Sequence, residues 1–188
     1  MQEKLKGQNL RILDLGCGTG FTSLQLALAC KNLGGSIEKV IGIDHVRDFV
    51  EIGKNVLDSI ETPASATLLG KIELHSIDVQ NPQDIRELSN GDFDIIHMGA
   101  APAPCLLSLY ISMLKSGGII VGPVRAYERT YSCFSPWISQ AVRADQKFAK
   151  ITKSLENDSN SNMLAAREDL LDVIYTPFQD LNVQLLSQ

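Results

Sequence analysis

Short apolar segments alternate with amphipathic segments along the first two thirds of the chain, and this alternation restricts the possible folds more than any other feature. The apolar segments are bounded by Gly, Pro, Asp or Asn, as buried parallel strands usually are. The segments between them are typical of helices that cover a sheet. The pattern predicts an α/β fold with a mostly parallel, doubly wound sheet. The expected strands are residues 11–15, 40–43, 72–77, 93–98 and 118–124.

Helices are expected between these strands, at residues 21–32, 46–60, 82–88 and 104–114. Gly34 and Gly35 end the first of them. The second helix carries its apolar residues near a 3.6-residue period. Pro82 stands at the first position of the third, where proline is favoured. Residues 115–118 are expected to form a turn from the last of these helices into the next strand.

Beyond residue 124 the alternation weakens. Residues 125–144 have no clear period and are expected to form an insertion or a lid. Two later segments, 148–155 and 170–177, are expected to pair as an antiparallel C-terminal edge of the sheet, with a polar loop at 156–161. No linker is long enough to separate two domains, so residues 1–188 are expected to form a single domain.

Composition and charge argue against several classes of partner. The 188 residues are 44% hydrophobic and 21% charged, as in an ordinary soluble domain. A net charge of −5 does not suit binding along a nucleic-acid backbone, which requires a basic face. No apolar run approaches the ~20 residues of a membrane span, and residues 1–6 do not form a signal peptide. We therefore expect a cytoplasmic protein with neither a nucleic-acid nor a membrane partner.

The four cysteines have no spacing typical of a metal site. They are Cys17, Cys30, Cys105 and Cys133, and each lies in or beside an apolar stretch. They are expected to be reduced packing residues, with a redox or zinc-binding role as the less favoured alternative. No metal site is therefore expected.

A glycine-rich segment follows the first expected strand and precedes the first expected helix, which is the position of a nucleotide-binding loop. It contains Asp14, Gly16, Gly18 and Gly20. Glycine lets the backbone turn sharply and lets a ligand approach without a Cβ in the way. The spacing differs from the Gly-x-Gly-x-x-Gly of dinucleotide-binding proteins, which disfavours an NAD-dependent oxidoreductase. Taken alone, the glycines could also form a tight turn with no ligand.

Acidic residues follow the second and third expected strands. Asp44 stands where a carboxylate can accept hydrogen bonds from both hydroxyls of a ribose, although it could instead cap the following helix. Asp78 stands where it could accept a hydrogen bond from an adenine amino group, although it could equally be a loop residue before Pro82. Because open α/β sheets bind ligands at the carboxyl ends of their strands, the glycine loop and both carboxylates together predict one site.

The spacing of Gly16, Gly18 and Gly20 resembles the first motif of class I S-adenosylmethionine-dependent methyltransferases, which have a Rossmann-like fold. Four further segments resemble protein-L-isoaspartate (D-aspartate) O-methyltransferases, namely residues 40–45, 93–101, 114–118 and 173–177. That family methylates the α-carboxylate of isoaspartyl residues and so starts the repair of damaged Asn and Asp sites. The resemblance covers residues 10–124 and resumes around residues 146–184. It implies S-adenosyl-L-methionine as cofactor, S-adenosyl-L-homocysteine as product, and isoaspartyl (and D-aspartyl) proteins or peptides as substrates.

The resemblance also implies roles for individual residues. The expected cofactor contacts are Asp14, Gly16, Gly18, Thr19, Asp44, His45, Asp78, Val79, Gln80 and Gln184. The expected substrate contacts are Gly99, Ala100 and Thr176. His97 is expected to line the mouth after the fourth strand, or else to be a core residue. No catalytic residue is expected, because a carboxylate is already ionised at neutral pH and can attack the methyl group directly.

Some positions depart from the family. Val79 and Gln80 stand where it usually has Gly-Arg, and Gln179 stands where it usually has Thr. A long N-terminal region with a Thr-Ile-Ser-type segment that contacts substrate precedes the glycine loop in the family, whereas residues 1–10 precede the first strand here. We expect a fragment or natural short form that lacks this region, is monomeric, and methylates isoaspartyl sites weakly or not at all. The alternative function is a cofactor-binding adaptor or pseudoenzyme without methyl transfer.

Overall fold

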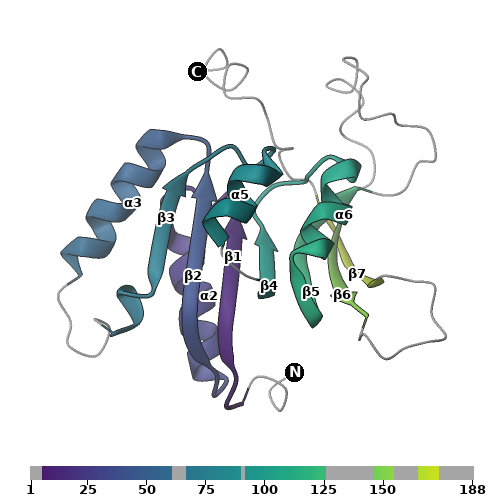
Figure 1. Ribbon diagram of the computed structural model, residues 1–188, viewed down its shortest axis with the longest axis horizontal. Helices are drawn as coiled ribbons and strands as arrows, with labels where there is room; N and C mark the ends of the chain where they lie inside the picture. The colour runs from purple at the N-terminus through teal and green to yellow at the C-terminus, as the bar shows by residue number, and fades with distance from the viewer. Residues whose placement is uncertain (1–5, 61–66, 90–91, 126–145, 155–164, 174–188) are drawn as a thin grey trace.

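The computed structural model of the chain describes residues 6–60, 67–89, 92–125, 146–154 and 165–173, which are coloured in Figure 1. Within these ranges the strands form one seven-stranded sheet in the order β3-β2-β1-β4-β5-β6-β7. The strands are β1 (Asn9–Leu15), β2 (Ser36–Asp44), β3 (Ile72–Ser76), β4 (Phe93–Met98), β5 (Leu114–Arg125), β6 (Gln146–Lys153) and β7 (Ala165–Val173). The helices are α2 (Phe21–Asn32), α3 (Arg47–Ser59), α5 (Pro82–Ser89) and α6 (Pro104–Ser112).

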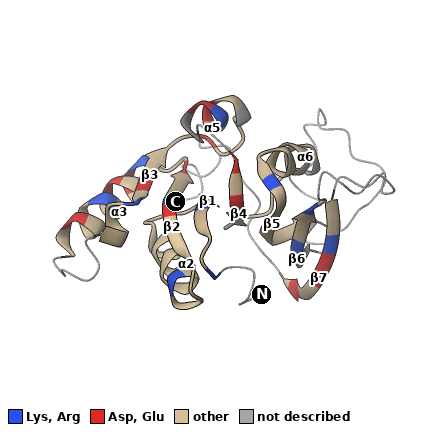
Figure 2. Ribbon diagram, turned by 60° about the horizontal axis from the view of Figure 1, so that its bottom comes forward, with Lys and Arg blue, Asp and Glu red and all other residues tan. Residues whose placement is uncertain are grey.

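The pairing of the strands confirms the predicted fold class. β1 to β5 pair in parallel, and β6 and β7 pair antiparallel at the edge of the sheet. Within the described residues the last strand runs over Ala165–Val173, so it begins earlier than the predicted segment 170–177, the end of which lies outside the described residues. β7 is an edge strand with exposed charged residues, so its sequence lacks the apolar signal of a buried strand. Lys147 and Lys150 of β6 pair with Asp172 and Glu168 across this edge (Figure 2).

Helices cover both faces of the sheet, with α5 and α6 in front of it and α2 behind it in Figure 1. The side chains divide into two buried clusters in the same way. One joins α5 and α6 to the sheet through Ile85, Leu107 and Tyr110. The other joins α2 and α3 to the sheet through Ala27 and Val50. This is the layered arrangement of a doubly wound α/β fold.

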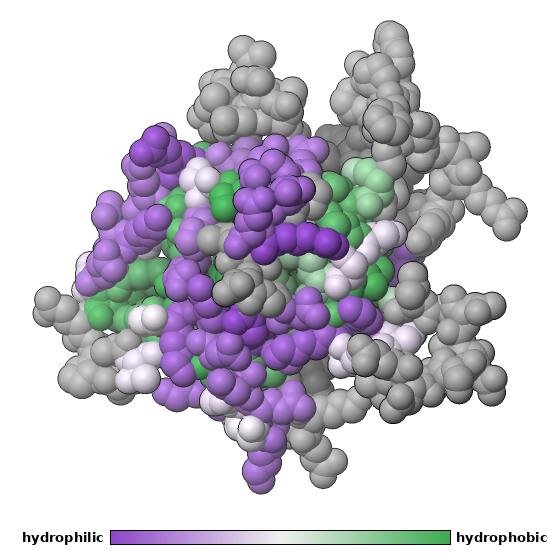
Figure 3. All heavy atoms as spheres, viewed as in Figure 1, coloured by the Kyte–Doolittle hydropathy of each residue, from purple (hydrophilic) through white to green (hydrophobic). Residues whose placement is uncertain are grey.

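Helix α3 buries less of its apolar surface than its sequence period predicts. Val50 is 1% exposed, whereas Phe49, Ile52 and Val56 are 38%, 50% and 52% exposed. The helix packs closely at Gly53, where an added Cβ would lie 2.5 Å from a backbone carbonyl oxygen of the glycine loop. Contact through this small residue fixes which side of the helix faces inward and leaves the other apolar side chains outside. Figure 3 shows the described surface on one side as largely hydrophilic, with hydrophobic residues exposed in separate areas.

The turn predicted at residues 115–118 lies inside β5. The predicted helix 104–114 ends at Ser112, and β5 begins two residues later. In the pairing of β4 with β5, Phe93 stands opposite Leu114 and Ile95 stands opposite Ile119, so the intervening residues of β5 bulge out of register. Gly117, with φ of 78°, allows this irregularity. The glycines therefore mark a distortion within a strand and not the start of one.

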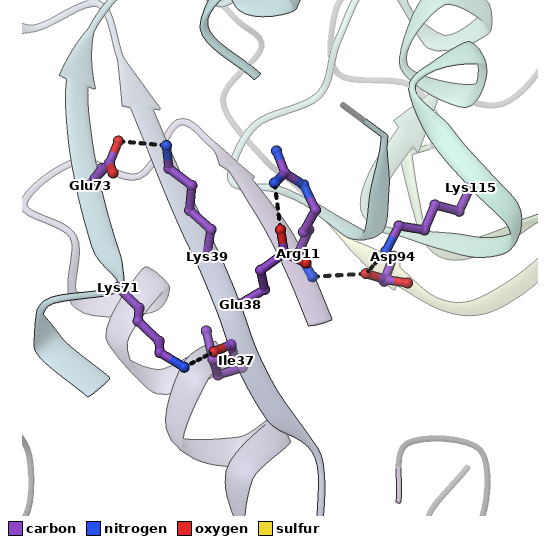
Figure 4. Close-up of polar contacts among 8 residues, drawn as sticks. All are labelled: Arg11, Ile37, Glu38, Lys39, Lys71, Glu73, Asp94 and Lys115. Atoms are coloured by element: carbon purple, nitrogen blue, oxygen red, sulfur yellow. Dashed lines mark hydrogen bonds and ion pairs between the residues drawn. The ribbon is translucent and has the colours of Figure 1, made fainter. Parts of the chain in front are cut away.

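A polar network ties the strands together near the starts of β1 and β4 (Figure 4). The backbone N–H of Arg11 and the Nζ of Lys115 both donate to Oδ2 of Asp94, each at 2.8 Å. The guanidinium of Arg11 also lies 2.8 Å from the carboxylate of Glu38 on β2. These contacts support the sheet away from the carboxyl ends of the strands. No helix within the described ranges is long and apolar enough to cross a membrane.

Candidate functional site

The strand order reverses between β1 and β4, and this reversal fixes where a ligand can bind. From β1 the chain proceeds to β2 and β3 on one side, and then returns to β4 and β5 on the other. The loops that follow β1 and β4 therefore diverge, and open α/β sheets bind their ligands outside the carboxyl ends of such strands. The predicted site residues within the described ranges lie at or after the ends of β1, β2, β3 and β4, so the fold brings them to the same edge of the sheet.

The glycine loop joins β1 to α2 and is held against β2. Gly16, Gly18 and Gly20 have φ angles of 78°, 55° and 76°, which residues other than glycine rarely adopt. The backbone N–H groups of Gly16 and Cys17 both donate to the carbonyl oxygen of Ile43, at 2.8 Å and 3.1 Å. A Cβ added at Gly18 would meet no atom within 4 Å, so open space lies beside the middle of the loop. Thr19 is exposed next to it.

Asp44 bridges the glycine loop and the start of α3. Its Oδ2 accepts a hydrogen bond from the backbone N–H of Gly18, and its Oδ1 accepts one from the N–H of Val46, both at 2.9 Å. The side chain is 11% exposed. The carboxylate therefore supports the entry to α3, where Val46 is the N-cap residue, and also contacts the loop. Its contact with a ribose stays a prediction. His45 lies beside it, with Nδ1 3.8 Å from Oδ1 of Asp44.

Asp14 is fully buried beneath the glycine loop, with 0% exposure. Its Oδ2 accepts a hydrogen bond of 2.6 Å from the hydroxyl of Ser23, and its Oδ1 lies 2.7 Å from Nδ1 of His97. Both carboxylate oxygens thus have protein partners, and the side chain does not reach the surface. A direct contact between Asp14 and a bound ligand does not agree with this placement.

Sequence reasoning missed Ser23. The residue lies in the first turn of α2 and is itself fully buried, facing the strand that carries Asp14. A hydroxyl on the otherwise apolar inner side of a helix was the available signal, because a buried hydroxyl requires a hydrogen-bond partner. Together Ser23, Asp14 and His97 connect α2, β1 and β4 below the loop.

The backbone after β4 passes very close to the glycine loop. The N–H of Gly99 donates to the carbonyl oxygen of Leu15 at 2.7 Å. A Cβ added at Gly99 would lie 2.6 Å from the carbonyl oxygen of Gly16, so only glycine allows this approach. Ala100 follows it and is partly exposed. The predicted substrate contacts at Gly99 and Ala100 therefore lie beside the predicted cofactor loop.

The segment after β3 places Asp78 at the surface and the side chain of Val79 in the core. Asp78 is exposed, and its Oδ1 accepts a hydrogen bond from the N–H of Gln80 at 2.8 Å. The side chain of Val79 is 1% exposed and belongs to the core, so it is not available to a ligand. The carbonyl oxygen of Val79 accepts a hydrogen bond of 2.6 Å from the hydroxyl of Tyr110. Burial raises the pKa of Tyr110 well above its usual range, so this hydroxyl remains protonated.

The remaining expectations concern Thr176, Gln184, the insertion at 125–144, the cysteines and a metal site. Thr176 and Gln184 lie outside the described residues, and so does the expected insertion or lid apart from residue 125. Cys17 in the loop is buried, and burial together with Asp14 and Asp44 raises the pKa of its thiol, which makes it unsuited to act as a nucleophile. Among the described residues, no group of three or more His, Cys, Asp or Glu side chains is arranged to hold a metal ion.

A seven-stranded, mostly parallel sheet with a glycine loop after β1 and a carboxylate at the end of β2 defines a Rossmann-like nucleotide-binding fold. The sequence matches the model of a family described as a methyltransferase domain over residues 6–169. The chain therefore belongs to the methyltransferase domain family.

A sequence relative and a solved structure are similar to this chain more specifically than the family model is. The chain is 32% identical over 124 residues to protein-L-isoaspartate O-methyltransferase 1 of Arabidopsis thaliana, which confirms the predicted resemblance. The match covers 65% of this chain and 49% of that protein, so the chain spans about half the length of its relative. A crystal structure from Plasmodium falciparum, of a candidate protein-L-isoaspartate O-methyltransferase in complex with S-adenosyl-L-homocysteine, superimposes with a TM-score of 0.62. At 18% identity, covering 95% of this chain and 69% of the other, it supports the fold.

Proposed function

We propose that this chain is an S-adenosyl-L-methionine-dependent carboxyl O-methyltransferase that acts on L-isoaspartyl (and D-aspartyl) residues in damaged proteins or peptides. The observation that carries the proposal is the 32% identity to a protein-L-isoaspartate O-methyltransferase over 124 residues. A match to the methyltransferase domain alone would leave the substrate open, because one fold hosts many reactions. The proposal therefore rests on the sequence relative for the substrate and on the site geometry for the cofactor.

The residues at the carboxyl edge of the sheet fit this cofactor. Open space lies beside Gly18, where a Cβ would meet nothing within 4 Å. Asp44 uses one acceptor position on each oxygen for backbone N–H groups, and each carboxylate oxygen has a second. The partly exposed carboxylate can therefore accept hydrogen bonds from ribose hydroxyls without releasing the loop. Asp78, exposed after β3, is available to an adenine amino group on the far side of β2.

The chain's own residues need only bind and align the two reactants. When bound, S-adenosyl-L-methionine supplies an activated methyl group for transfer to an oxygen. The acceptor carboxylate of an isoaspartyl residue is already ionised at neutral pH, so no side chain has to remove a proton from it. The part of the rate enhancement that comes from holding two reactants in line can be large without any acid or base. Gly99 and Ala100, next to the glycine loop, are the proposed positions at which the acceptor approaches.

The decisive experiment measures methyl transfer to a matched pair of peptides. The chain is incubated with radiolabelled S-adenosyl-L-methionine and with one peptide that carries either isoaspartate or normal aspartate at the same position. We expect transfer to the isoaspartyl peptide alone. Cofactor binding by calorimetry with no transfer above the peptide-free rate would contradict the proposal and favour the adaptor function.

A pair of variants links the activity to the site. Asp44→Asn replaces a carboxylate oxygen with an amide N–H that cannot accept a hydrogen bond, so we expect cofactor affinity to fall by about tenfold or more. Asp48→Asn, on the exposed first turn of α3, changes charge equally and is expected to have no effect on binding. Equal affinities of the two variants would mean that the cofactor does not contact Asp44.

A further inference from the structure

Asp14 and His97 lie at the point where the strand order reverses. They stand directly opposite each other in the register of β1 and β4, the two strands that flank the reversal. Their side chains meet there, with Nδ1 of His97 2.7 Å from Oδ1 of Asp14. Asp14 is completely buried, whereas 17% of the His97 side chain is exposed. Of this pair, only His97 can contact a bound ligand.

The buried carboxylate fixes the orientation of the imidazole ring. An ionised carboxylate only accepts hydrogen bonds, so Nδ1 of His97 carries the hydrogen that it shares with Asp14. The hydroxyl of Ser23 donates to the other oxygen, which holds the carboxylate itself in place. In a neutral imidazole with this tautomer, Nε2 has a free lone pair. Within the described part of the chain, Nε2 of His97 accepts no hydrogen bond.

The sheet order determines which part of the cofactor reaches this ring. Under the proposed function, the ribose lies at Asp44 after β2 and the adenine extends toward Asp78 after β3. β1 and β4 lie on the opposite side of β2 from β3. The amino-acid arm, which leaves the ribose on the side away from the adenine, therefore extends over β1 and β4. Of Asp14 and His97, only the partly exposed His97 can then lie against that arm.

We propose that Nε2 of His97 accepts a hydrogen bond from the ammonium group of the cofactor's amino-acid arm, and that Asp14 is a positioning residue behind it. This inference rests on the proposed function and deepens it by naming a contact. It also accounts for the environment of Asp14, since Ser23 and His97 are its hydrogen-bond partners among the described residues and the cation of the cofactor would lie near its buried charge. The negative charge of Asp14 and the lone pair of His97 together complement a cation.

Two ligands that differ only in the arm test the proposal. S-adenosyl-L-homocysteine carries the amino-acid arm, whereas 5′-methylthioadenosine retains the adenosine and sulfur without it. In His97→Asn the amide nitrogen can replace Nδ1 as the donor to Asp14, but nothing replaces Nε2. We expect this variant to bind S-adenosyl-L-homocysteine about ten- to a hundredfold more weakly in calorimetry, with the affinity for 5′-methylthioadenosine unchanged.

Matched variants separate a contact from a structural role. His75→Asn, on β3 beside Glu73, is expected to leave both affinities unchanged. His97→Gln places an amide near the position of Nε2 and is expected to keep more affinity for S-adenosyl-L-homocysteine than the Asn variant. If His97→Asn lowered the affinity for both ligands to the same degree, or for neither, the proposed role of His97 would be overturned. If the wild-type chain bound neither ligand, both the proposed cofactor and this contact would be contradicted.

Discussion

Removing the hydroxyl of Ser23 tests whether the buried contact beneath the glycine loop stabilises the fold. Ser23→Ala leaves Oδ2 of the fully buried Asp14 without its 2.6 Å hydrogen bond. A hydrogen bond to a charged group contributes about 1.5–3 kcal/mol, and its loss cannot be replaced by water at a site with no exposed surface. Alanine is the better helix former by about 0.5 kcal/mol, which offsets part of the loss. We therefore expect a net destabilisation of about 1–2.5 kcal/mol.

The assay is urea unfolding followed by circular dichroism, with the free energy of unfolding taken from the midpoint at constant m-value. Ser59→Ala is the matched control, because Ser59 is also a helical serine but is exposed and donates to a carbonyl oxygen of its own helix at 2.7 Å. Its replacement is expected to change the free energy of unfolding by less than about 0.5 kcal/mol. If the two variants were equally stable, the reasoning that Ser23 satisfies a buried charge would be refuted.

Three further changes follow from the packing. Gly53→Ala places a methyl group 2.5 Å from the carbonyl oxygen of Thr19, and we expect a loss of about 1–3 kcal/mol in the same unfolding assay. Tyr110→Phe leaves a buried carbonyl oxygen unsatisfied and should cost about 1–3 kcal/mol, whereas an unchanged midpoint would show that the carbonyl finds another donor. A hydrogen bond from Lys39 lowers the pKa of Glu73 from its usual 4.5, so the stability that this pair contributes is present above that pH and is lost as the pH falls through the lowered pKa. Because both side chains are partly exposed, Lys39→Met should lower the free energy of unfolding by less than about 1 kcal/mol at neutral pH. In acid it should leave the free energy of unfolding unchanged.

The parts of the fold that the sequence predicts well are those determined by local patterns. The helix Phe21–Asn32 and the strand Phe93–Met98 have the predicted bounds, because a glycine loop or an acidic residue marks their ends. Predictions fail where contacts distant in sequence override the local pattern. Val79 follows a strand and was expected at the ligand edge, but Tyr110 of α6 holds its backbone and the core encloses its side chain.

The contact between Asp14 and His97 shows the same limit at the site. The two residues are 83 positions apart, and their pairing depends on β4 lying directly beside β1. A sequence pattern identifies each as the end of a strand but contains no information about which strand is its neighbour. Once the strand order is known, the register places the two side chains opposite each other.

The two carboxylates that the sequence treats alike differ in one physical property, their access to solvent. Asp14 and Asp44 both lie at the carboxyl end of a central strand, but their side chains are 0% and 11% exposed. Backbone N–H groups hold Asp44 at the surface of the loop and leave it further acceptor capacity. Asp14 is enclosed by Ser23 and His97, so its charge can act on a ligand only through the imidazole. Exposure therefore separates the two carboxylates, and under the proposals above Asp44 is the one that contacts the ligand and Asp14 the one that orients its neighbour.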